Sequence, residues 1–247
     1  LGCEMCGAHC PNTIDGGEVM IALRELAAQE GYRREDCEAL REVLAASLAS
    51  GDEVPVDERL CTGIGRLNHL SDALTTSHNV SGDDNTERLI WSENLERVPE
   101  GLAGRKGVEL VYFVGCVGAF FPQSYRVPQA MTRLLEVAGV DFTTLGGDEW
   151  CCGYPLLALG EEDQAAVMAK HNVAVLEALG AKRLVTTCPS CYHMWQHLYP
   201  DLLDRPPDVE VLHATELLAG LMEQGRIPLG ELPLRVSYHD PCDLGRK

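Results

Sequence analysis

Apolar runs alternate with helix-like repeats through the middle of the chain. Four short segments have the nearly unbroken apolar pattern that is typical of a strand buried on both faces: residues 108–114, 140–145, 183–187 and 209–212. Three segments repeat apolar residues every three to four positions, as helices do: residues 131–138, 161–179 and 214–224. Because strands and helices alternate, we expect an α/β domain over residues 108–231, with a mostly parallel sheet and flanking helices.

The first part of the chain has helical patterns. Apolar positions at helical spacing predict helices over residues 19–30 and 34–49, and residues 86–95 read as a short helix. Residues 99–107 contain three glycines, which is typical of a domain linker. We therefore expect an α-helical module over residues 1–100 in front of the α/β domain.

Composition and charge narrow the possible partners. Of the 247 residues, 45% are hydrophobic and 23% are charged, as in ordinary globular proteins. The net charge of −18 argues against nucleic acid and anionic membranes as direct partners, and it suits docking to a basic face of another protein. No apolar run approaches the roughly 18 residues that a direct membrane span requires.

Five cysteines stand at the ends of the predicted strands: Cys116, Cys151, Cys152, Cys188 and Cys191. Cys116 and Cys188 directly follow strands, and Cys151-Cys152-Gly153 lies in the loop after another strand. Because ligands of parallel sheets bind outside the carboxyl ends of the strands, we expect one crevice to collect all of these thiols. Neighbouring α-carbons are about 3.8 Å apart, so Cys151 and Cys152 suit neighbouring metal atoms. Gly153 provides room where the backbone passes close to a bulky group.

A second cysteine motif opens the chain. Cys3, Cys6, Cys10 and Pro11 have the spacing C-x2-C-x3-C-P, which matches the last three cysteines of a bacterial ferredoxin run. We expect the first cysteine of that run to fall just outside this chain. A structural zinc site is the alternative reading of the motif. Cys37 and Cys61 read as small core or surface residues.

The end of the chain repeats the start of the α/β domain. Tyr238 precedes Cys242 by four positions, as Tyr112 precedes Cys116. We infer that a second copy begins in residues 232–247, and that the chain is a fragment cut at both ends. The cysteine usage is that of metal-bound thiols in a reducing cytosol. Any association with the inner face of the cell membrane is expected to go through a partner.

These motifs together resemble a known family. The five-cysteine pattern looks like the cysteine-rich CCG domain of heterodisulfide reductases. The whole layout looks like their D-type subunit, which fuses a ferredoxin-like module to two CCG copies. The iron–sulfur subunit of glycolate oxidase and a subunit of a sulfite-reduction-linked membrane complex share it. The resemblance implies an iron–sulfur oxidoreductase subunit that acts on disulfides or thiols.

The resemblance also implies a set of cofactors and partners. Cys3 and Cys6 would bind one ferredoxin-type [4Fe-4S] cubane, and Cys10 would bind another. The cysteines implied at CCG clusters are a longer set: Cys116, Cys151, Cys152, Cys188 and Cys191 at a noncubane [4Fe-4S] cluster, with Cys242 in the second copy. The implied partners are a membrane cytochrome b-type or flavin subunit and a small disulfide or thiol substrate.

Two other functions and several histidines stay open. The chain is alternatively a relay subunit of a flavin-dependent glycolate- or lactate-type dehydrogenase, or a zinc-stabilised interaction protein. His239 is a candidate proton donor for released thiolates, or hydrogen-bonds its own loop. His193 and His197 form either a metal pair or a solvated or packed helix face. His78 either covers a cluster or hydrogen-bonds within a loop.

Overall fold

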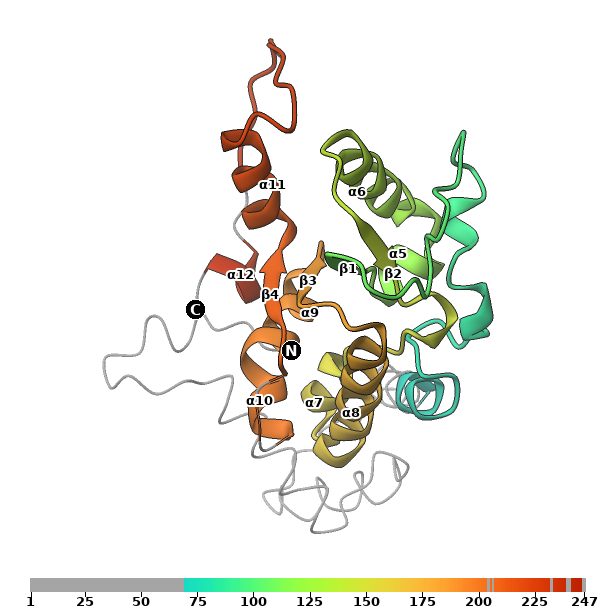
Figure 1. The fold of residues 1–247 in the computed structure, drawn as a ribbon. Coiled ribbons are helices and arrows are strands. Elements are labelled where there is room, and N and C mark those ends of the chain that lie inside the picture. Colours follow the sequence, from blue (N-terminus) through green and yellow to red (C-terminus); the bar gives the residue numbers. More distant parts are fainter. Residues whose placement is uncertain (1–68, 204, 206, 232, 239–240, 246–247) are drawn as a thin grey trace, which may run out of the picture.

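The computed structural model describes residues 69–203, 205, 207–231, 233–238 and 241–245 (Figure 1). The predicted helices over residues 19–30 and 34–49 lie outside this range. So do the predicted site residues Cys3, Cys6, Cys10 and His239, and also Cys37 and Cys61. The described residues comprise the α/β domain, the segment before it and the short segment after it.

A four-stranded parallel sheet forms the centre of the described part. Its strands, in spatial order, are β2 (Phe142–Thr144), β1 (Leu110–Phe113), β3 (Arg183–Thr186) and β4 (Glu210–His213). Each strand lies within a segment predicted from its apolar pattern, except that β4 ends one residue later, at His213. The prediction of a mostly parallel α/β sheet is thereby confirmed.

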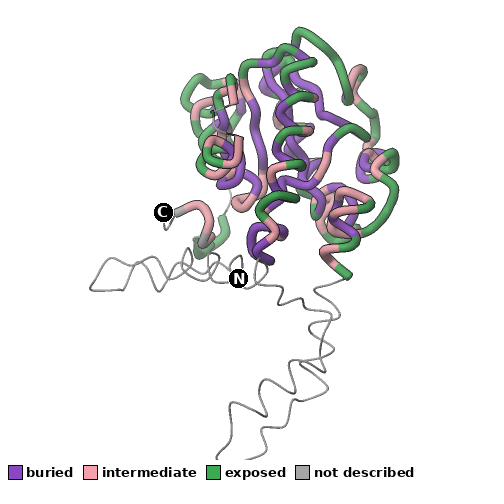
Figure 2. The backbone as a smooth tube through the Cα atoms, turned by 90° about the horizontal axis from the view of Figure 1, so that it is seen from below, coloured by how far each residue is buried: buried purple, intermediate pink, exposed green. Residues whose placement is uncertain are grey.

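Helices cover both faces of the sheet (Figure 1). One face packs against α6 (Arg126–Val137) and α11 (Ala214–Glu223), and the other packs against α7 (Tyr154–Leu159) and α8 (Glu162–Leu179). Successive residues of β1 alternate between the two cores: Leu110 and Tyr112 face α6, while Val111 and Phe113 face α8. All four are buried, which explains why the strand has no polar face. In Figure 2 the buried segments run through the interior of the domain, and the exposed segments lie around it.

Several short helices lie in or near the cysteine loops. They are α5 (Cys116–Phe120), α9 (Pro189–His193), the π-helix η5 (Met194–Leu198), α10 (Tyr199–Leu202) and α12 (Cys242–Gly245). The segments α9, η5 and α10 follow one another without a break and bury Trp195 and Tyr199 in the core. No helix among the described residues has both the length and the apolar surface needed to cross a membrane.

The segment before the sheet differs from its prediction in its secondary structure. In place of a helix over residues 86–95 there are two 3₁₀ turns, η1 (Asn85–Glu87) and η2 (Ile90–Ser92). Trp91 is fully buried, and its carbonyl accepts a hydrogen bond from Gln129 of α6 at 2.7 Å. Tertiary contacts therefore determine the conformation of this segment.

The glycine-rich segment 99–107 lies along the edge of β2. Thr144 donates its N–H to the carbonyl of Leu102, and Gly104 donates to Thr144, at 2.7 and 2.9 Å. Buried Leu102 and Trp91 belong to the core on the α6 face. Residues 69–104 therefore pack on the α/β domain, and the boundary predicted near residue 100 stays a prediction.

Candidate metal centre

The cysteine crevice lies where the strand order reverses. From β1 the chain moves to β2 on one side, and β3 lies on the other side of β1. Cys116 is the first residue of α5 beyond β1, and Cys188 immediately precedes α9 beyond β3. Such a switch point is where open parallel sheets bind ligands.

The five thiols lie close together and form what we call the thiol row. In the order Cys116, Cys151, Cys152, Cys191 and Cys188, each thiol shifts the pKa of the next. Four of the five residues are buried, and Cys188 is partly exposed. The three loops that were predicted to converge therefore do meet, although residues more than 70 positions apart contribute to the row.

Five thiols are one more than the four ligands that a single structural zinc ion takes. Within the part of the chain that the structure describes, no group of three or more His, Cys, Asp or Glu side chains is arranged to hold one metal ion. The end members of the row, Cys116 and Cys188, also lie close enough for Cys116 to raise the pKa of Cys188. This donor set suits several metal atoms better than one.

Hydrogen bonding separates the acidities of the thiols. The Cys151 thiol, and then that of Cys191, lowers the pKa of Cys152 to about 6. The Cys191 thiol likewise lowers the pKa of Cys188 to about 7. Sharing its proton with Cys151, together with burial, raises the pKa of Cys116. Thiolates are the metal-binding form of cysteine, and the lowered pKa values of Cys152 and Cys188 favour that form.

Two glycines let the backbone approach this crowded region. Gly115 has φ +78°, and a Cβ there would lie 3.3 Å from the sulfur of Cys191. Gly153 has φ +90°, and a Cβ there would lie 3.3 Å from the backbone of Ala165. Both need the left-handed region that glycine tolerates. The bulky neighbour of Gly153 in this structure is thus helix α8, which packs directly against the Cys151-Cys152 loop.

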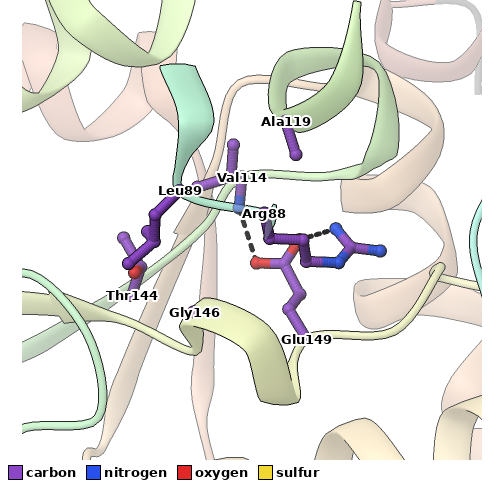
Figure 3. A pocket seen from close by; sticks show the side chains of 7 residues that line it. All are labelled: Arg88, Leu89, Val114, Ala119, Thr144, Gly146 and Glu149. Carbon is purple, nitrogen blue, oxygen red and sulfur yellow. Dashed lines mark hydrogen bonds and ion pairs between the residues drawn. The ribbon is translucent and has the colours of Figure 1, made fainter. Parts of the chain in front are cut away.

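A buried ion pair touches the row, and sequence reasoning missed it. Arg88 and Glu149 are 2% and 1% exposed, and their nearest side-chain atoms are 2.8 Å apart (Figure 3). Arg88 Nη2 also donates to the sulfur of Cys116 at 3.3 Å. Burial raises the pKa of Glu149, although Arg88 and two backbone amides oppose that rise. The one sequence feature that could have indicated this ion pair is Glu149, which lies two residues before the Cys151-Cys152 pair.

Polar contacts from other elements fix the Cys151-Cys152 loop. Asn172 of α8 donates to the carbonyl of Cys151 at 3.0 Å, and Tyr199 of α10 donates to that of Cys152 at 3.0 Å. The N–H of Cys151 donates to the carbonyl of His78 at 2.8 Å. The His78 ring stacks on Trp150, with centroids 3.5 Å apart. His78 therefore acts in the loop through its carbonyl, and its ring covers Trp150 beside the cysteines.

The start of the predicted second copy reaches the same crevice. Helix α12 lies against α9. The carboxylate of Asp243 accepts hydrogen bonds from Ser190 at 2.6 Å and from Tyr154 at 3.2 Å. Ser190 lies between Cys188 and Cys191, and Tyr154 follows Gly153, so Asp243 bridges two cysteine loops. Cys242 is the first residue of α12.

The two histidines of the predicted metal pair lie side by side. The ring centroids of His193 and His197 are 5.2 Å apart, with His193 buried and His197 exposed. Tyr192 contacts the ring of His197 edge-on. Among the described residues no third ligand joins them in a group that could hold a metal ion. The packed-face reading agrees with this arrangement.

Fold and crevice together define a cysteine-rich α/β domain. Residues 110–196 match the family model described as CCG, the cysteine-rich domain, so this segment is a CCG domain and the predicted resemblance is confirmed. No solved structure matches the chain.

Curated relatives agree with this assignment. The D-type polypeptide of the dihydromethanophenazine:CoB–CoM heterodisulfide reductase from Methanosarcina barkeri is 34% identical over 174 residues, covering 68% of this chain and 40% of the relative. EtfAB:quinone oxidoreductase of Syntrophomonas wolfei is 35% identical over 142 residues, covering 57% of this chain and 20% of the relative. A probable membrane-anchored ferredoxin of Chromohalobacter salexigens is 30% identical over 248 residues, covering 99% of this chain and 32% of the relative. The chain spans less than half the length of each of these relatives.

Proposed function

We propose that the thiol row binds an iron–sulfur cluster and that the chain is part of an electron-transfer oxidoreductase subunit. The observation that carries the proposal is the single row of Cys116, Cys151, Cys152, Cys191 and Cys188 at the switch point of the sheet. The donor chemistry fits, because iron–sulfur clusters are held by cysteine thiolates, and hydrogen bonds to their sulfurs set the reduction potential.

The proposed reaction is the reduction of a disulfide, as the names of the heterodisulfide reductase relatives suggest. A disulfide takes up two electrons and two protons and yields two thiols. The cluster, when bound, supplies one electron at a time. In this proposal ferredoxin-type [4Fe-4S] cubanes at Cys3, Cys6 and Cys10 deliver the electrons, and His239 is the proposed proton donor.

The described residues contribute geometry and burial. Asn172 and Tyr199 donate hydrogen bonds to the carbonyls of Cys151 and Cys152, so the backbone of the cysteine pair is held in place. The buried thiols keep water from four of the five sulfurs. Cys188 is partly exposed and lies at one end of the row, so a small disulfide would approach from that end.

A second function has separate support. The names of EtfAB:quinone oxidoreductase and of the probable membrane-anchored ferredoxin mention no disulfide. We therefore keep as the alternative an iron–sulfur relay subunit that serves a flavin enzyme of the glycolate or lactate dehydrogenase type. In both cases the partners are other redox subunits, with a cytochrome b-type or flavin subunit as the expected neighbour.

The test begins with iron and acid-labile sulfide measured in the complete protein after anaerobic purification. Both are expected in excess over zinc, and zinc alone would end the cluster proposal. A small thiol is then added to the oxidised protein, and its electron paramagnetic resonance spectrum is recorded. A new paramagnetic species supports the disulfide reaction, whereas an unchanged spectrum with iron present favours the relay function.

A further inference from the structure

A buried cation lies against one end of the thiol row, outside the matched domain. Arg88 precedes the segment 110–196 that matches the CCG model. Its guanidinium is 2% exposed and lies 3.3 Å from the sulfur of Cys116. Desolvating a guanidinium is costly, and a fold keeps one buried when the surroundings compensate for it. The contacts of the Arg88 guanidinium therefore indicate its role.

Four contacts fix the orientation of Arg88. Its Nε donates to Asn85 at 3.0 Å, Nη1 donates to Glu149 at 2.8 Å, and Nη2 donates to Cys116. The ring of Phe120 lies 5.2 Å from the guanidinium carbon. Each nitrogen thus has its own partner, so the guanidinium plane is set and Nη2 points at sulfur.

The partners of Arg88 are themselves held in place. Glu149 accepts the N–H groups of Val114 and Gly115 at 3.0 and 2.8 Å, so its carboxylate is tied to the end of β1 (Figure 3). Asn85 receives a hydrogen bond from fully buried Asn79 at 3.0 Å. The donor to Cys116 is therefore preorganised by the loop before the domain and by the end of the central strand.

We infer that Arg88 is a positioning residue that raises the reduction potential of the cluster bound at Cys116. The inference rests on the proposed function, and concerns how that site is tuned. Reduction adds one negative charge to the cluster. A nearby cation that donates a hydrogen bond to a ligand sulfur stabilises this charge, and low local dielectric strengthens the effect.

The experiment is a potentiometric titration of the complete protein, following the paramagnetic signal of the CCG-bound cluster. Three variants are compared with wild type: Arg88→Lys, Arg88→Met and the control Arg183→Met. Lysine keeps a cation, but a single ammonium cannot reproduce the three separate donations of arginine. The midpoint potential is expected to fall in Arg88→Lys, to fall further in Arg88→Met and to stay unchanged in Arg183→Met, at equal iron content per chain.

The possible failures are distinguishable. Absence of iron in the wild-type protein would refute the proposed function itself. Equal midpoint potentials in wild type and Arg88→Lys, with iron bound in both, would refute the tuning role and leave the cluster proposal intact. If Arg88→Met fails to fold or to bind iron, the midpoint potential of Arg88→Lys alone decides whether Arg88 tunes the cluster. Loss of iron from Arg88→Lys as well would also overturn the inference, because Arg88 would then serve assembly and not potential.

Discussion

Two arginines at opposite ends of one sheet have opposite environments. Arg88 lies at the carboxyl end of the strands, where its pair with Glu149 is almost fully buried. Arg183 begins β3 at the amino end, where it pairs with Glu109 at 3.0 Å and with Glu210 at 2.9 Å. The side chain of Arg183 is 31% exposed, and its two partners are 43% and 58% exposed.

The contrast indicates which end of the sheet is built for chemistry. An exposed pair costs little to form and contributes about 0–1 kcal/mol. A buried pair carries a desolvation cost of several kcal/mol and is weak evidence for stability. The pair with the large desolvation cost, Arg88–Glu149, lies beside the cysteines, and the exposed pairs of Arg183 lie at the other end of the sheet. Each of the following changes tests this difference between the ends, beginning with the largest expected effect.

Cys152→Ser is expected to abolish the cluster at the CCG domain. Cys152 is the middle of the row and its pKa is shifted by both Cys151 and Cys191, so its replacement removes the central sulfur of the five. Iron analysis and low-temperature paramagnetic resonance of the complete protein should show that the CCG cluster is lost and the ferredoxin-type cubane is kept. Cys61→Ser is the matched control. Equal loss of both clusters would show that the proposed division into two modules is wrong.

Glu149→Ala is expected to destabilise the fold by about 3–5 kcal/mol, because it leaves a buried guanidinium without its counter-charge. It also leaves the N–H groups of Val114 and Gly115 without their acceptor. Urea unfolding of the variant measures the loss. Glu210→Ala, which removes a partner of Arg183, is the control at the other end. A loss below about 1 kcal/mol in Glu149→Ala would mean that the buried pair is not held as the structure implies.

The sheet and the convergence of the cysteines followed from local pattern. Apolar runs marked the strands, and the rule that ligands gather at carboxyl ends of parallel strands placed Cys116 and Cys188 in one crevice. Both inferences depend mainly on residues that are close to one another in the sequence. The short helices after the cysteines were not predicted, because five- or six-residue segments give too little periodicity to recognise.

The ion pair between Arg88 and Glu149 could not be predicted, because it depends on residues that are far apart in the sequence. Arg88 and Glu149 are 61 positions apart, and each lies in an irregular segment where charged residues are ordinarily solvated. Asn79 is a similar case, because its neighbours in the sequence are those of a solvated loop. In the structure it is fully buried, and its side-chain amide forms hydrogen bonds with five other residues. Buried polar networks depend on tertiary contacts that a single sequence does not display.

Asp243→Ala is expected to cost about 1–3 kcal/mol locally, because two hydroxyl donors lose a carboxylate acceptor. The lost contacts are those to Ser190 and Tyr154, which join α12 to two cysteine loops. Hydrogen exchange should show faster exchange in residues 241–245 and 188–191. Asp208→Ala, whose carboxylate pairs with Lys182 on the exposed surface, is the control. Unchanged exchange at residues 188–191 would show that α12 does not restrain the crevice.

Arg183→Met is expected to have the smallest effect, below about 1 kcal/mol, because its ion pairs are exposed and screened by solvent. The hydrophobic stem of methionine can still cover the neighbouring strands, so packing at the start of β3 is kept. Urea unfolding and iron content should both stay close to wild type. A destabilisation as large as that of Glu149→Ala would remove the distinction between the two ends of the sheet. The buried pair beside Cys116 would then need no explanation other than stability, and the case for its redox role would rest on the potentiometric result alone.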